Sequence, residues 1–100
     1  MSAPTKITGL NRQQTEAINR LVDDELLLPY PGPLVVTATT ATFPWEPGLA
    51  ASRVRHAQLS LGRIDGTRGG HYQALHAVIR KLKAQTQVNL PVFDALVRGK

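Results

Sequence analysis

A glycine-rich stretch at residues 62–70 is the first place in this sequence where side chains and backbone could together bind a ligand. It contains Arg63 and Arg68 and leads into a predicted helix that begins at His71. Glycines let a backbone approach an anion closely, a helix N-terminus presents unpaired N–H groups, and arginine donates paired hydrogen bonds to phosphate or carboxylate. The stretch therefore predicts an anion site, although it matches neither the P-loop nor the dinucleotide-binding pattern. The alternative is a flexible connector whose arginines are solvated.

The predicted helix that follows carries polar and basic side chains along one face. They recur at i, i+3, i+7 and i+10, and they are Gln73, His76, Arg80 and Lys83. Such a row can follow a phosphate backbone, whereas the alternative is an ordinary solvated helix face. The stretch and the row together give the candidate ligand-binding residues, which are Arg63, Arg68, Gly69, Gly70, His71, Gln73, His76, Arg80 and Lys83.

The positive charge of the chain is concentrated in its second half. Residues 53–100 hold nine of the 12 Lys and Arg residues but two of the seven Asp and Glu residues. This asymmetry indicates nucleic acid, a nucleotide or an acidic protein surface as the partner. We therefore expect non-enzymatic binding of an anionic partner, most simply nucleic acid, through residues 63–83. The alternatives are a small adaptor or inhibitor that docks on another protein, and an oligomer that binds or sequesters a small nucleotide.

The residue types that usually catalyse reactions or bind metals do not form a recognisable constellation here. The chain has no cysteine, and His71 and His76 are five positions apart, which is not a spacing that brings two ligands together on a helix. His56 is remote from both in the sequence. Neither paired carboxylates nor a nucleophile with a base is evident. We therefore expect no catalytic residue, no metal site and no cofactor.

Apolar periodicity predicts two main helices and a short one. The first covers residues 11–27, with Asn11 and Gln14 at capping-box spacing. The clearest covers residues 71–86, where apolar side chains recur at helical steps. A short helix is expected to restart at Pro91 and to complete the set.

The strands are harder to place than the helices. β-branched residues predict one strand at residues 34–43. Residues 50–64 alternate as a strand would, but as a helix they align one stripe made of Ala50, Val54, Ala57, Leu61 and Ile64. Because the first strand needs a hydrogen-bonded partner, we assign residues 53–64 to a second strand. Trp45, in a proline-bracketed loop, is expected to cover the small core rather than to anchor a partner.

These elements predict an α+β fold in the order helix, strand, strand, helix and short C-terminal helix, with helices packed on a small sheet. Residues 1–10 are expected to be a flexible N-terminal tail and residues 11–100 a single small domain. Two strands and a modest core favour a homo-oligomer, most simply a dimer. No apolar run approaches the ~18 residues of a membrane span, and residues 1–6 lack the apolar segment of a secretion signal. We therefore expect a cytoplasmic protein with no membrane partner.

Overall fold

The computed structural model describes residues 4–66 and 70–88 of the chain. Within them the elements follow in the order β1 (Thr5–Ile7), α1 (Arg12–Asp23), β2 (Val35–Val36), β3 (Ala41–Phe43), α2 (Pro47–Asp65) and α3 (Gly70–Val88). The described residues therefore form three helices and a three-stranded antiparallel sheet, which confirms the predicted α+β class. The predicted order of elements differs from this one, and the short helix expected from Pro91 lies outside the described residues.

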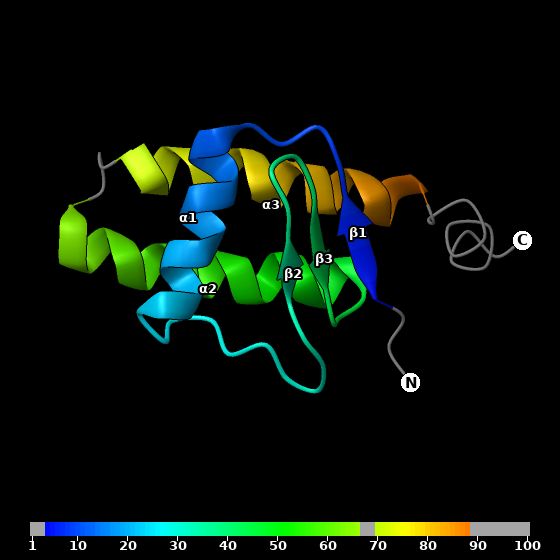
Figure 1. Cartoon of the computed structure of the whole chain (residues 1–100), viewed down its shortest axis with the longest axis horizontal. Coiled ribbons are helices and arrows are strands. Elements are labelled where there is room, and N and C mark those ends of the chain that lie inside the picture. The colour runs from blue at the N-terminus through cyan, green and yellow to red at the C-terminus, as the bar shows by residue number, and fades with distance from the viewer. Residues whose placement is uncertain (1–3, 67–69, 89–100) are drawn as a thin grey trace, which may run out of the picture.

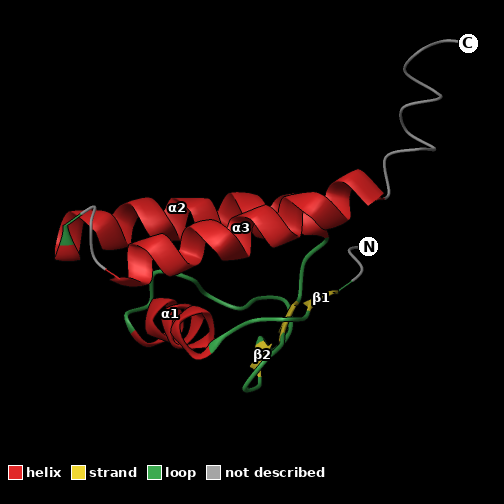
Figure 2. Ribbon diagram, turned by 90° about the horizontal axis from the view of Figure 1, so that it is seen from above, coloured by secondary structure: helices red, strands yellow, loops and turns green. Residues whose placement is uncertain are grey.

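The elements are arranged in two layers (Figures 1 and 2). α2 and α3 run antiparallel and side by side as a long helical hairpin, and α1 crosses this hairpin on one face together with the small sheet. The hydrophobic core draws on both layers, with Ile18 of α1, Phe43 of β3, Leu61 of α2 and Leu75 of α3 all buried. In Figure 2 no described element covers the opposite face of the hairpin. Exposed side chains of both helices meet solvent there.

The sheet has the strand order β1-β3-β2, with both neighbours antiparallel to β3. The single strand predicted over residues 34–43 is wrong, because the chain reverses direction at residues 37–40 and forms a β2–β3 hairpin. The Thr37 N–H donates to the Thr40 carbonyl at 2.9 Å, and the two hydroxyls are 2.6 Å apart. Part of the predicted N-terminal tail is also ordered, because Thr5–Ile7 forms β1 and Ile7 is buried.

Residues 50–64 form a helix, so the strand predicted there is wrong and its helical alternative is right. α2 begins with Pro47, whose missing N–H is one that the first turn of a helix leaves unpaired in any case. The buried side includes most of the stripe aligned by helical spacing, namely Ala50, Val54, Ala57 and Leu61. Ile64, the last member of that stripe, is 61% exposed. No strand was needed at this position, because β3 pairs with β1 and β2, which both precede it.

α1 begins as the sequence predicts and ends earlier than predicted. The side chain of Asn11 accepts a hydrogen bond from the Gln14 N–H, and the side chain of Gln14 accepts one from the Asn11 N–H, both at 2.9 Å. The helix ends at Asp23, several residues before the prolines, because Glu25 adopts a left-handed conformation with φ of 60°. The Leu26 N–H then bonds the Leu21 carbonyl at 2.8 Å, which satisfies a carbonyl at the helix end.

The helix predicted over residues 71–86 is confirmed as α3. Its apolar residues at helical spacing are buried as expected: Leu75, Val78, Ile79 and Leu82. Trp45 is also buried, with 1% of its surface exposed, and its indole N–H donates to the Tyr30 carbonyl. Its expected place over the core is therefore confirmed.

Candidate anion-binding face

The exposed face of the helical hairpin gathers basic side chains from two helices. We call this the outer face and define it by the exposed residues Ser52, Arg55, Leu59 and Arg63 of α2 and Gln73, His76, Arg80 and Lys83 of α3. In each helix these residues recur at steps of three and four, so they share one side. The buried apolar residues of both helices lie on the other side, against α1 and the sheet.

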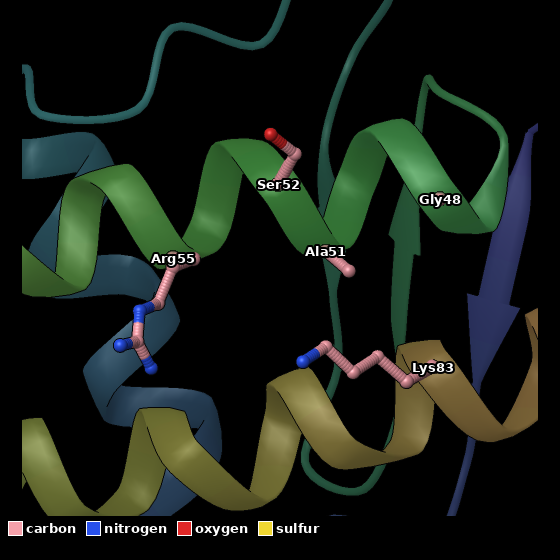
Figure 3. A pocket seen from close by; sticks show the side chains of 5 residues that line it. All are labelled: Gly48, Ala51, Ser52, Arg55 and Lys83. Atoms are coloured by element: carbon pink, nitrogen blue, oxygen red, sulfur yellow. The ribbon is translucent and has the colours of Figure 1, made fainter.

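A groove runs between α2 and α3 at one end of the outer face (Figure 3). It encloses about 500 Å³ and is lined by Gly48, Ala51, Ser52, Arg55 and Lys83. The side chains of Arg55 and Lys83 extend from opposite helices into the space between them, while α1 and the strands lie behind the hairpin in this view. Because Gly48 and Ala51 are small, the wall that α2 contributes is set back and the groove stays open.

The outer face carries no carboxylate among the described residues. The described part of α3 has no acidic residue, and the one acidic residue of α2, Asp65, is ion-paired with Arg20 of α1 at 2.8 Å. Within residues 4–66 and 70–88, neither Arg55 nor Lys83 has an acidic partner within ion-pair distance. Two cations that face one groove repel each other, so an anion placed between them would be stabilised by both.

Not every arginine of α2 contributes to this face. The guanidinium of Arg53 lies over the ring of Trp45, 4.9 Å from its centroid, in a cation–π contact. Arg53 therefore packs against the core, although it is only two positions from Arg55. Two positions turn a helix by about 200°, so the two side chains leave α2 on nearly opposite sides.

A small ionic cluster fixes the end of α2 that carries Arg63. Arg20 of α1 bonds Asp24, the C-cap residue of the same helix, at 2.8 Å and reaches Asp65 in the last turn of α2. The hydrogen bond to Asp24, and to a smaller extent the one to Asp65, raise the pKa of Arg20 above its ordinary value. Arg20 therefore stays positively charged at neutral pH. The cluster joins the ends of the two helices.

The predicted ligand-binding residues separate into three groups in the structure. Arg63, Gln73, His76, Arg80 and Lys83 lie together on the outer face. Gly70 and His71 line a different hollow, beside Gln13 and Glu16 of α1. Arg68 and Gly69 lie outside the described residues.

The predicted loop over residues 62–70 is shorter than expected. Gly62 and Arg63 belong to the last turn of α2, and α3 begins at Gly70. The described residues therefore give Arg63 a helical position rather than a place in a glycine-rich cradle.

Lys83 is the one groove residue among the predicted candidates, and the two polar residues that α2 adds, Ser52 and Arg55, were missed along with Gly48 and Ala51. The signal of the two polar residues was present, because residues 52, 55, 59 and 63 recur at helical steps of three and four. The strand assignment hid this signal, since alternation separates residue 52 from residue 55. Strand alternation placed Arg55 and Arg63 on the apolar side with Ala57 and Leu61, whereas helical spacing places the two arginines on the exposed side of α2.

A metal-binding cluster and a membrane-spanning helix are both absent from residues 4–66 and 70–88. These residues contain no group of three His, Cys, Asp or Glu side chains that could hold a metal ion. Nor do they contain a helix with the length and apolar character required to span a bilayer. A scan against models of protein families found none that matches the chain, and searches of curated proteins and of solved structures also returned no match.

Proposed function

We propose that this protein binds nucleic acid without catalysing a reaction, and that the outer face of the α2–α3 hairpin is its binding surface. The observation that carries this proposal is the gathering of Arg55, Arg63, Arg80 and Lys83 on one uncovered face with no carboxylate among the described residues. A phosphate backbone is the polyanion that such a surface suits best, because each neutralised phosphate releases counterions.

The shape of the hairpin favours contact with the backbone over reading of bases. Packed helices have axes about 8–10 Å apart and are each about 10 Å thick, so the hairpin is about 20 Å wide. A major groove of about 12 Å admits one helix and excludes a pair lying flat. The outer face would therefore lie across phosphates, which position a protein without specifying sequence.

Duplex is favoured over single-stranded nucleic acid as the partner. Single-strand binding usually depends on several aromatic rings on which bases stack, and the residues that define the outer face include no Phe, Tyr or Trp. The exposed hydrophobic side chain among them is Leu59, which is 40% exposed. An aliphatic side chain gives bases no stacking platform, so the affinity rests on charge.

The test is binding to a random duplex, measured by fluorescence anisotropy over a range of salt concentrations. We expect affinity at low salt and a steep loss as salt rises. The double variant Arg63→Gln with Arg80→Gln should bind more weakly and with a shallower salt dependence. The matched control is Lys6→Gln with Arg12→Gln, which removes two exposed cations from the other layer. The proposal is overturned if the protein does not bind duplex at low salt, or if the control variant loses as much duplex affinity as the Arg63→Gln with Arg80→Gln variant.

A second candidate, docking on another protein, is favoured by one separate observation. Three large hydrophobic side chains are exposed in one segment, with Leu28 at 64%, Tyr30 at 78% and Val35 at 49%. Val35 also borders an apolar hollow of about 350 Å³ whose lining is rich in proline, with Pro4, Pro31, Pro33 and Pro44. Light scattering coupled to size exclusion shows whether the protein forms a dimer, and a variant in this segment tests whether this surface makes the contact. Tyr30→Ser should abolish any such dimer.

A further inference from the structure

We propose that the groove between α2 and α3 binds a single phosphate group, held between Arg55 and Lys83. The ligand class is a phosphate ester of nucleic acid or of a nucleotide. This inference rests on the proposed function, because the groove opens on the same outer face. The inference adds one specific phosphate site on this face, formed by two residues on different helices.

The groove offers the donors that a phosphate requires. Arg55 provides a planar guanidinium that can bond two phosphate oxygens at once, and Lys83 provides a compact point charge from the opposite side. Ser52 also lines the groove, but in Figure 3 its hydroxyl points away from α3, so it lies at the rim and is not counted as a donor. Two charged donors, one from each helix, therefore extend into one space.

The groove is also shaped to admit a bulky anion. Gly48 and Ala51 line it without side chains that could fill it, and a Cβ added at Gly48 would meet no atom within 4 Å. Both residues lie in the first turns of α2, where the helix dipole places partial positive charge. The dipole, the two cations and the open floor all favour a negative group at this place.

The carboxylate nearest to the groove residues in the sequence, that of Glu46, lies outside the groove and so does not face a bound phosphate. Glu46 is the N-cap residue of α2, two positions before Gly48, and two positions correspond to about 200° around a helix. Glu46 is also absent from the residues that line the groove. The groove is therefore a different anion site from the glycine-rich loop that the sequence suggested, and the two depend on different residues.

The direct test is a titration of the isotopically labelled protein with inorganic phosphate, at constant ionic strength balanced with sodium chloride. We expect saturable shifts of the NMR signals of Ser52, Arg55 and Lys83. Arg55→Gln with Lys83→Gln should weaken phosphate binding by at least about tenfold, because charge-assisted hydrogen bonds are lost. The control variant Lys6→Gln with Arg12→Gln, which removes the same charge elsewhere, should retain it. Shifts that are small, linear and spread over the whole surface would overturn the proposal.

A second variant tests the groove without removing any cation. Gly48→Glu places a carboxylate in the groove at a position with room for a side chain, and Gly48→Gln places a neutral group of similar shape there. We expect Gly48→Glu to bind phosphate several times more weakly than Gly48→Gln. Equal affinity in the two variants would contradict an electrostatic site at this position. Dispersed NMR spectra establish that each variant is folded.

Two small ligands identify the source of the phosphate. A dinucleoside monophosphate has an internal phosphodiester and no terminal phosphate, whereas a nucleoside 5′-monophosphate has the reverse. If both ligands bind at Arg55 and Lys83, the groove accepts either an internal phosphodiester of the backbone or a terminal phosphate. Binding of the monophosphate alone indicates a chain end or a free nucleotide. Binding of neither overturns the proposal.

The outcomes separate this proposal from the one on which it rests. Duplex binding that depends on Arg63 and Arg80, without saturable phosphate shifts at Arg55 and Lys83, removes the groove site and leaves the outer face as a diffuse polyanion surface. Saturable phosphate binding without duplex binding leaves the groove as a compact anion site and removes nucleic-acid binding. Loss of both overturns both proposals.

Discussion

Gln58 of α2 donates a hydrogen bond from its side-chain Nε2 to the main-chain carbonyl of Tyr72 in α3, at 3.0 Å. The side chain is fully buried, and its Oε1 has no hydrogen-bond partner among the described residues. This bond joins the two helices of the hairpin at the start of α3, so it helps to set their register. One half of the amide is satisfied, and the other half carries a desolvation cost.

The unpaired oxygen leads to a prediction about stability. Gln58→Leu removes the buried polar atom and keeps most of the volume, so the free energy of unfolding should change by less than about 1.5 kcal/mol or increase. Gln58→Ala leaves a cavity and should cost about 2–3 kcal/mol. Urea denaturation measures both. If Gln58→Leu lowers the free energy of unfolding as much as Gln58→Ala does, the hydrogen bond to Tyr72 contributes more than the unpaired oxygen costs.

The core contribution of α3 can be tested at Ile79, which is 3% exposed. Ile79→Ala should lower the free energy of unfolding by about 2–5 kcal/mol, because it removes buried methylene groups and leaves a cavity. Gln73→Ala is the control on the same helix, because Gln73 is exposed. Thermal denaturation followed by circular dichroism gives the comparison. If Ile79→Ala melts like the wild type, the buried side of α3 is wrongly placed.

The basic residues of α3 should govern the salt dependence of duplex binding. Arg80→Ala with Lys83→Ala should lower the slope of log affinity against log salt by up to about two, since each lost phosphate contact contributes close to one. The slope is obtained from anisotropy titrations at several salt concentrations. The variant Lys6→Gln with Arg12→Gln should keep the wild-type slope. An unchanged slope in the α3 variant would place the phosphate contacts elsewhere.

Substitution of Gly48 should raise stability even where it weakens phosphate binding. Replacing a helical glycine by a residue with a side chain stabilises a helix by about 0.5–1 kcal/mol, and a negative charge in the first turn adds about 0.3–1 kcal/mol. Gly48→Glu should therefore melt at a higher temperature than Gly48→Gln, which in turn melts above the wild type. Calorimetry checks this order. A destabilised Gly48→Glu protein would mean that its loss of phosphate affinity could not be assigned to charge.

The Arg20 cluster should respond to salt and not to alkaline pH. Arg20→Ala should lower the melting temperature, and the difference from the wild type should shrink at high salt, because the pairs with Asp24 and Asp65 are partly exposed. The pKa of Arg20 is raised in the folded protein, so its stabilising effect is complete below the unfolded pKa and is lost only as pH rises through the still higher folded pKa. The difference should therefore be constant from neutral to mildly alkaline pH. A decline over that range would assign the effect to another group.

The start of α1 and the buried side of α3 could be predicted from the sequence because their signals are local. The capping pair of Asn11 and Gln14 marks the start of one helix, and apolar residues at steps of three and four mark the buried side of the other. Both signals lie within a few turns of chain. The row of polar and basic residues on α3 followed from the same spacing.

The sheet and α2 were missed because their determinants are short or distant. β1 has three residues, which is too few for a recognisable alternation, and its partner in β3 is far along the chain, with Thr5 opposite Phe43. The turn between β2 and β3 contains no glycine, proline or asparagine to mark it. Without β1, residues 50–64 were the remaining candidate for a partner strand. The strand assignment put Arg55 and Arg63 on the side that faces the core, so the exposed basic side of α2, including the Arg55 side of the groove, was not predicted.

The two-layer arrangement has a consequence for how the protein is made. The ribosome synthesises β1, α1, β2 and β3 before the helical hairpin, yet the buried Ile18 and Leu21 of α1 belong to the same core cluster as Leu75 and Val78 of α3. Until α3 has been synthesised, the apolar side of α1 lacks part of its packing surface. α2 and α3, by contrast, are joined by a short connection and can pair as soon as both have left the ribosome. The core of the first half of the chain therefore stays incompletely packed until α3 has been synthesised, and it is completed by contact with the helical hairpin.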